Sequence, residues 1–109
     1  MAQVNLREKK VFAFDCDGVI CETEGTDYEK ATPKKKNIHK INALYYGGQH
    51  ITIFTGRGTV SGIDWREVTE KQFKDWGLCY HELIFGKPNF DVFIDDKAWN
   101  VKDFEGGMV

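Results

Sequence analysis

Carboxylate, hydroxyl and ammonium groups stand at or beside the ends of short apolar segments of this chain. The residues that carry them are Asp15, Asp17, Thr55, Lys87, Asp95 and Asp96. If the segments are strands of one sheet, four carboxylates gather at one edge, where their mutual repulsion raises the pKa of some of them. A hard divalent cation relieves this repulsion, and oxygen ligands beside a phosphate group favour Mg²⁺. Turn formation or helix capping would explain a single aspartate at a strand end. It is a poor explanation for four carboxylates together with a threonine and a lysine.

The segments that must position these groups are short and apolar on both faces, which is typical of strands buried between helix layers. They span residues 11–14, 50–54, 80–85 and 90–94. Between them, apolar residues recur at helical spacing in two places. Thr32-Pro33 predicts the N-cap and first residue of one helix, which ends at Gly47. Asp64 begins the other helix and Gly77 ends it.

This alternation predicts an α/β fold, a three-layer α/β/α, Rossmann-like arrangement around a mostly parallel sheet. We expect a single domain over residues 1–109, with a core at about residues 10–98 and a loose tail at 99–109. The polar stretch 21–31 fits neither period and is interpreted as an excursion above the sheet. Ligands of such sheets bind outside the carboxyl ends of the strands, where the six candidate residues stand.

The composition argues against several classes of protein. The 109 residues include 15 basic and 17 acidic side chains, a net charge of −2 that disfavours a general nucleic-acid binder. Three cysteines without paired spacing favour reduced thiols in a cytoplasm over a disulfide framework or a zinc site. No apolar run is long enough to span a bilayer, and residues 1–10 lack a signal-peptide core, so we expect a cytoplasmic protein.

Four motifs in order resemble those of the haloacid dehalogenase (HAD) superfamily. They are Asp15-Cys16-Asp17-Gly18-Val19-Ile20, Thr55-Gly56-Arg57-Gly58, Lys87 and Asp95-Asp96, spread over about residues 10–98. The closer likeness is to small members encoded with bacterial capsule and surface-polysaccharide genes, through residues 55–58, 62–65, 86–88 and 94–98. The resemblance implies a minimal HAD core.

The resemblance also implies a role for each motif residue, although the residues alone leave open which aspartate does which. Asp15 is the expected nucleophile that forms an aspartyl-phosphate, and Asp17 is the expected general acid and base. The expected phosphate-binding residues are Gly18, Thr55, Gly56 and Lys87. The expected Mg²⁺ ligands are Asp15, the main-chain carbonyl of Asp17, Asp95, and Asp96, the last directly or through water. Arg57 is either a further substrate-binding residue or a surface arginine.

Larger members of the superfamily carry a cap domain after the first motif or between the second and third. The intervals from Ile20 to Thr55 and from Thr55 to Lys87 each hold too few elements for one. We therefore expect a capless member whose open site admits large substrates or is covered by a second subunit of a homo-oligomer. The acidic stretch 21–31 is the local segment that could act as a small flap, and its charge disfavours polyanions.

These observations predict a Mg²⁺-dependent phosphomonoesterase that acts on a sugar or polyol phosphate or a related intermediate of carbohydrate biosynthesis. Its partner would be a small phosphorylated substrate, and neither nucleic acid nor membrane. The enzymatic alternative is a polynucleotide 3′-phosphatase, which the net charge disfavours, or another macromolecular phosphatase. A phosphorylated receiver-like module is the alternative from another class. A receiver places its acidic pair before the acceptor aspartate, whereas here Asp15 and Asp17 come first and Asp95-Asp96 follows Lys87.

Overall fold

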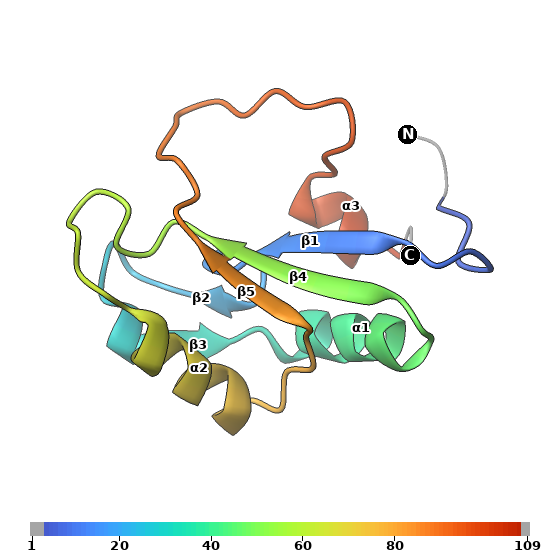
Figure 1. Ribbon diagram of the computed structural model, residues 1–109, viewed down its shortest axis with the longest axis horizontal. Helices are drawn as coiled ribbons and strands as arrows, with labels where there is room; N and C mark the ends of the chain where they lie inside the picture. Colours follow the sequence, from blue (N-terminus) through green and yellow to red (C-terminus); the bar gives the residue numbers. More distant parts are fainter. Residues whose placement is uncertain (1–3, 108–109) are drawn as a thin grey trace.

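The computed structural model describes residues 4–107, which form a parallel sheet with helices packed against it (Figure 1). In chain order the elements are β1 (Val11–Asp15), β2 (Cys21–Glu22), the 3₁₀ helix η1 (Tyr28–Lys30), β3 (Thr32–Pro33), α1 (Lys35–Tyr46), β4 (His50–Thr55), α2 (Arg66–Asp75), β5 (Glu82–Phe85) and α3 (Val101–Glu105). The main sheet has the order β1-β4-β5 with all strands parallel, and β2 pairs with β3 separately in antiparallel fashion. The α/β class and the Rossmann-like alternation of strands and helices are confirmed.

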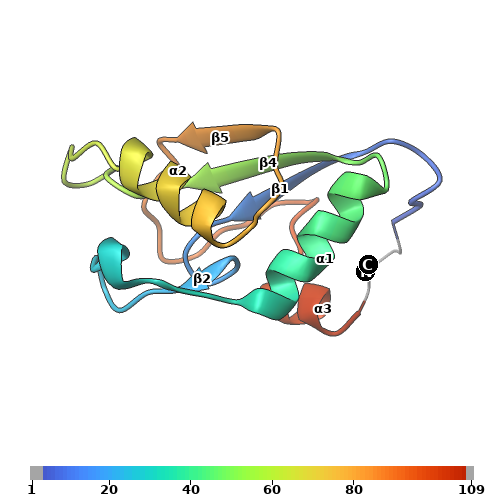
Figure 2. The same ribbon diagram turned by 90° about the horizontal axis from the view of Figure 1, so that it is seen from below.

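One face of the sheet forms the core. The register places Phe14, Ile53 and Leu83 side by side on this face, and all three side chains are buried. Helices α1 and α2 cover the same face, with Ile41 of α1 and Phe73 of α2 completely buried (Figure 2). Because side chains alternate along a strand, the residues between these point to the other face.

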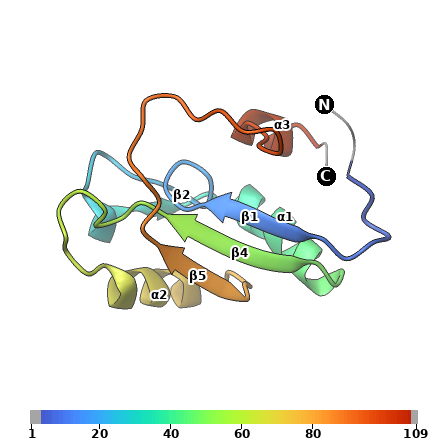
Figure 3. The same cartoon turned by 45° about the horizontal axis from the view of Figure 1, so that its top comes forward.

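The other face of the sheet lacks the second helix layer that we expected. Val11, Ala13 and Ile84 point to it, and all three side chains are exposed. Figure 3 shows the strands with α1 behind β4. Within residues 4–107, no helix covers the exposed face. The three-layer expectation is therefore met on one side of the sheet only.

Both predicted helix ends are confirmed, and both helices begin slightly later than predicted. Gly47 is the C-cap of α1, and Gly77, with φ of +69°, follows α2. Asp64 Oδ1 accepts a hydrogen bond from the Arg66 N–H at 3.0 Å, a turn directly before the helix, whose N-cap is Trp65 and whose first residue is Arg66. Across residues 4–107, every helix is too short or too polar to traverse a lipid bilayer.

Helix α1 begins after a folded excursion of the chain, residues 21–33, which we call the flap. Thr32-Pro33, predicted to start the helix, instead pairs with β2 in an extended conformation. Lys34 is the N-cap, and its N–H donates to the Ile20 carbonyl at 2.8 Å. This pairing closes the flap on itself and delays the helix by two residues.

The fourth predicted strand, residues 90–94, does not form. The segment belongs to a loop of residues 86–100, which we call the arch and which bows away from the sheet (Figure 1). Val92 is 74% exposed and Ile94 is 91% exposed. The main sheet holds β1, β4 and β5 only, and after the arch α3 packs Phe104 against Phe14 of β1. The apolar pattern was therefore misleading because strand formation depends on context.

The carboxyl-terminal segment is not the loose tail that we expected. The Asn100 side chain caps α3 by accepting from the Lys102 N–H at 2.9 Å. Phe104 is buried and meets Phe14 edge to face, with 5.3 Å between the ring centroids. Residues 101–107 thus belong to the packed structure, and residues 108–109 lie outside the described part of the chain.

Phe104→Ala should lower the free energy of unfolding by about 3 kcal/mol, because the substitution leaves a cavity against Phe14. Urea unfolding followed by circular dichroism measures the loss. Val92→Ala is the matched control, since that side chain is 74% exposed, and should change the stability by less than about 0.5 kcal/mol. Equal stabilities of the two variants would show that the tail is loose after all.

Candidate active site

The carboxyl ends of β1, β4 and β5 bring three predicted site residues together. Asp15 is the last residue of β1, Thr55 is the last of β4, and Lys87 follows β5. The Lys87 ammonium lies 3.1 Å from Asp15 Oδ2. The Lys87 N–H donates to the Thr55 carbonyl at 3.1 Å, which holds the start of the arch against β4. A cation therefore offsets the charge of Asp15, as the approach of a carboxylate to a phosphate dianion requires.

Asp17 is held in place by a two-point ion pair with Arg57. Arg57 Nε donates to Asp17 Oδ2 at 3.0 Å, and Nη2 donates to Oδ1 at 2.9 Å. The Thr23 hydroxyl of the flap donates to the same Oδ1 atom. These contacts leave the Asp17 carboxylate a single orientation, beside the strand that carries Asp15.

All the other N–H groups of the Arg57 guanidinium are also used within the protein. Nη1 donates to Thr69 and Gln72 of α2 at 3.0 and 2.6 Å, and Nη2 also donates to Cys21 Sγ at 3.5 Å. A guanidinium has five N–H donors, and these contacts employ all of them. The side chain has no exposed surface. Arg57 as placed has no donor left for a substrate and is not a surface arginine; it positions Asp17.

Two opposing effects set the pKa of Asp17. Burial alone would raise the pKa of this carboxyl, but hydrogen bonds from Arg57 and Thr23, together with the Arg57 charge, hold its pKa below the usual value. Asp17 is therefore ionised at neutral pH before substrate binds. A phosphate dianion beside Asp15 would add negative charge and raise the pKa of Asp17, which is the direction that a proton donor needs.

The glycine and threonine positions predicted to bind phosphate differ in accessibility. Gly56 lines the pocket above Asp15. Gly18 has φ of +94°, which favours glycine, but its N–H donates to the Cys21 carbonyl at 2.8 Å. Thr55 is completely buried, and its hydroxyl oxygen accepts from the Arg57 N–H at 3.2 Å. Neither Gly18 nor Thr55 lines the pocket, so their contacts with phosphate stay predictions.

Asp95 and Asp96 do not join the other carboxylates. Both are exposed residues of the arch, and neither lines the pocket. Asp95 Oδ1 accepts from the Lys97 N–H at 2.8 Å, a turn within the arch itself. The strand that was expected to carry the pair to the sheet edge does not form, so their role as metal ligands stays a prediction.

Within residues 4–107, one group of thiol and carboxylate side chains is close enough to hold a metal ion, and the resemblance implies a second set of donors at Asp15. Cys16, Asp17 and Cys21 each place one ligand atom within 4.8 Å of the others. This group suits a hard ion poorly, because thiols favour soft metals and the Arg57 cation already contacts both Asp17 and Cys21. The Asp15 carboxylate and the Asp17 main-chain carbonyl are oxygen donors of the kind that Mg²⁺ prefers. The donor chemistry therefore fits Mg²⁺ at Asp15.

A pocket of about 570 Å³ opens above Asp15 and Lys87. Its walls come from the flap, from the loop 56–65 after β4 and from residues 88–90 of the arch. Tyr28 connects the flap to the loop after β4 and to α2. Its ring lies 4.9 Å from the Arg57 guanidinium, and its carbonyl oxygen accepts a hydrogen bond from Gln72 Nε2 at 2.6 Å. Sequence analysis missed this contribution of Tyr28, since a lone tyrosine in a polar stretch carries no periodic signal.

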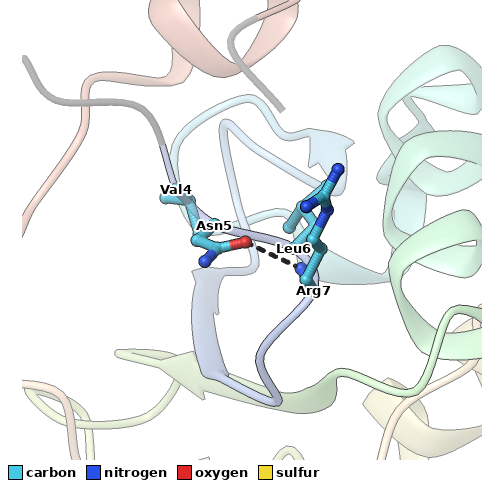
Figure 4. Close-up of a pocket in the computed structure, with 4 residues that line it drawn as sticks. All are labelled: Val4, Asn5, Leu6 and Arg7. Carbon is cyan, nitrogen blue, oxygen red and sulfur yellow. Dashed lines mark hydrogen bonds between the residues drawn. The ribbon is translucent and has the colours of Figure 1, made fainter.

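A second hollow lies at the amino-terminal turn, lined by Val4, Asn5, Leu6 and Arg7 (Figure 4). The Arg7 N–H donates to Asn5 Oδ1 at 3.0 Å, which closes the turn. None of these four side chains is a carboxylate, thiol or imidazole, so the hollow offers no general base or nucleophile. The pocket above Asp15, which carries carboxylates and an ammonium group, is therefore the candidate active site.

The fold is shared with solved structures of low sequence identity. No protein-family model matches the chain, and no curated protein does. An MCSG target from Vibrio cholerae is similar with a TM-score of 0.79 and 23% identity, over 89% of this chain and 87% of that one. Two structures of the Pnkp1/Rnl/Hen1 complex, one described as an RNA repair complex, match with TM-scores of 0.60 and 0.59 at 19% and 14% identity. They cover 88% and 94% of this chain, which spans only 33% and 32% of theirs.

Proposed function

We propose that this protein is a Mg²⁺-dependent phosphomonoesterase of the HAD type, without a cap domain, that works through an aspartyl-phosphate. The observation that carries the proposal is a partly exposed carboxylate, Asp15, 3.1 Å from the Lys87 ammonium at the floor of an open pocket. Asp17, oriented by Arg57, supplies a second carboxylate for proton transfer. The order of the motifs and the fold shared with a chain of the Pnkp1/Rnl/Hen1 complex support the same class.

The two aspartates divide the reaction between them. Asp15 attacks phosphorus in line, so that a bond forms between its carboxylate oxygen and phosphorus while the ester bond breaks. Asp17, which takes up a proton when the bound phosphate dianion raises its pKa, gives this proton to the leaving oxygen. A water molecule then attacks phosphorus, Asp17 takes its proton, and the bond to Asp15 breaks to release phosphate. Lys87 offsets the charge of Asp15 and of the phosphoryl oxygens in both steps.

The Asp15 carboxylate and the Asp17 main-chain carbonyl would hold Mg²⁺, with water at other positions. The bound ion supplies charge neutralisation to the phosphoryl oxygens. We further propose Asp95 and Asp96 as ligands, directly or through water. This role requires the arch to approach Asp15 more closely than it does in the described arrangement.

Asp95→Asn should weaken Mg²⁺ binding about tenfold or more, because it removes an anionic oxygen donor from the ion. Isothermal titration with Mg²⁺ alone measures the change without reference to turnover. Asp91→Asn, an exposed carboxylate of the same arch, is the matched control and should bind Mg²⁺ as the unaltered protein does. Equal affinities of the two variants would mean that Asp95 is not a ligand.

The proposed substrate is a sugar or polyol phosphate or a related intermediate of carbohydrate biosynthesis. The resemblance to small proteins encoded with polysaccharide genes supports this class. The flap beside the pocket also carries exposed acidic residues that repel a polyanionic strand, namely Glu22, Glu24, Asp27 and Glu29. A polynucleotide 3′-phosphatase is the second candidate, because the fold is shared with a chain of the Pnkp1/Rnl/Hen1 complex.

Hydrolysis of p-nitrophenyl phosphate, measured with Mg²⁺ and with EDTA, tests the proposed activity. We expect turnover that EDTA abolishes. Turnover that persists in EDTA would contradict the metal dependence, and a stable phospho-protein without turnover would identify a receiver-like module. A panel of sugar, polyol and nucleotide phosphates and a 3′-phosphorylated oligonucleotide then assigns the substrate. Selective hydrolysis of the oligonucleotide would replace the carbohydrate proposal.

A further inference from the structure

Apolar side chains surround the charged floor of the pocket, and we call them the collar. The collar consists of Tyr28 of the flap, Val60, Ile63 and Trp65 of the loop after β4, and Pro88 and Phe90 of the arch. Val60 is 80% exposed, Ile63 57% and Phe90 41%. A single exposed apolar side chain is ordinary, but several around one pocket mouth mark a binding surface.

The loop 56–65 holds its part of the collar on a fixed backbone. The Gly62 N–H donates to the Gly58 carbonyl at 2.8 Å. Gly58 has φ of +80°, and a Cβ atom there would lie 2.1 Å from the Ile63 carbonyl oxygen. The loop is therefore packed closely on itself and needs glycine at this point. The close backbone packing and the exposed Ile63 side chain together favour an apolar surface that is organised before a ligand arrives.

Aromatic rings from the flap, the loop after β4 and the arch line the space above the floor. Tyr28 and Trp65 meet edge to face with 5.0 Å between centroids and form one wall. On the arch, the Phe90 ring lies 5.3 Å from the Lys87 ammonium and stacks on Phe93 with 4.9 Å between centroids. A flat group bound against these rings would bury apolar surface while its phosphate reaches Lys87.

We propose that the collar binds the leaving group of the phosphomonoester, and that this group is a neutral ring with a flat, carbon-rich face, such as an aryl ring or the C–H face of a sugar. The inference rests on the proposed function, because the floor must hold the phosphoryl group. The two cations that line the pocket are already paired, Arg57 with Asp17 and Lys87 with Asp15. Neither is available for a second phosphate, so the leaving group is uncharged.

Two phosphonates that cannot be hydrolysed test the collar separately from turnover. 1-Naphthylmethylphosphonate and methylphosphonate share the anionic head and differ in the ring. We expect the naphthyl compound to bind about tenfold tighter or more, and the double variant Val60→Ser/Ile63→Ser to lose most of this advantage, because it removes apolar area from the collar. Isothermal titration measures all four dissociation constants. Val92→Ser, an exposed apolar position of the arch outside the pocket, is the matched control and should keep the advantage.

The possible outcomes separate the collar from the proposed activity. Equal affinity of the unaltered protein for the two phosphonates, or an unchanged ratio in the double variant, would overturn the collar even in an active phosphatase. Ring-dependent binding without hydrolysis of any phosphomonoester would keep the collar and overturn the proposed function. Tighter binding of a 3′-phosphorylated oligonucleotide than of the naphthyl compound would overturn the neutral leaving group. The substituted side chains are exposed, and circular dichroism checks that the variants fold.

Discussion

Asp15→Asn should lower kcat for p-nitrophenyl phosphate by at least about 10³-fold, a loss typical for removal of a covalent nucleophile. Asparagine has nearly the shape of aspartate, but its amide oxygen is uncharged and does not form the acyl-phosphate. The Lys87 ammonium also loses its partner 3.1 Å away, which removes the charge balance of the floor. Steady-state kinetics measures kcat, and rapid acid quench with labelled substrate shows whether a phospho-protein forms.

The control for this experiment is a carboxylate that leaves the floor untouched. Asp27→Asn removes a carboxylate of the flap, where Asp27 is exposed and lies 3.7 Å from the Lys30 ammonium. It should retain both turnover and the labelled phospho-protein. If Asp15→Asn retained more than about a tenth of the activity, another residue would be the nucleophile and the proposed mechanism would be wrong.

Arg57→Gln should lower kcat about 10²-fold, because Asp17 loses both bonds that orient it for proton transfer. The free energy of unfolding should fall by about 3 kcal/mol, since a largely buried carboxylate is left without its cation. Arg57→Lys retains the charge but cannot form a two-point contact, so it should recover part of the stability and little of kcat. Full recovery of kcat by lysine would mean that charge alone, and not orientation, is the contribution of Arg57.

The pH dependence of stability separates the ion pair from simple packing. Arg57 and Thr23 hold the pKa of Asp17 below its unfolded value, despite burial. The pair therefore stabilises the fold above the unfolded pKa, and this contribution is lost as the pH falls through the lower, folded pKa. In Arg57→Gln, burial is no longer opposed by a cation, and the pKa of Asp17 rises.

The stability difference between the unaltered protein and Arg57→Gln should consequently be larger at pH 7 than at about pH 4, near the ordinary pKa of aspartate. Urea unfolding at the two pH values measures it. Because Asp17 must be protonated to give its proton to the leaving oxygen, the alkaline limb of the pH–rate profile should also move to higher pH in the variant. A stability difference that is independent of pH would leave Arg57 with a packing role only.

The meeting of Asp15 with Lys87 could be predicted because each follows a local signal. A short apolar strand precedes each of them, helices alternate with the strands, and the parallel topology then places the strand ends at one edge. The role of Arg57 could not be predicted in this way. Its contacts with Asp17 and Thr69 join residues 40 and 12 positions apart, and they depend on how the loop after β4 turns back.

The carboxyl-terminal third of the chain shows the limit of apolar patterns. The segment 90–94 has the composition of a buried strand, yet composition does not reveal whether a neighbouring edge is available. Helix α3, with five residues, is too short to display a helical period, so its docking through Phe104 had no sequence signal. The candidate site also differs from the prediction, because Asp95 and Asp96 belong to the arch and lie outside the pocket.

The contacts of Arg57 also have a consequence for how the protein opens. One side chain joins the loop after β1, the flap and helix α2, through Asp17, Cys21 and Gln72. Detaching any one of these segments leaves a buried donor without an acceptor, at a cost of about 1–3 kcal/mol. The three segments therefore belong to one cooperative unit. The contacts that orient Asp17 are therefore lost only when these segments separate.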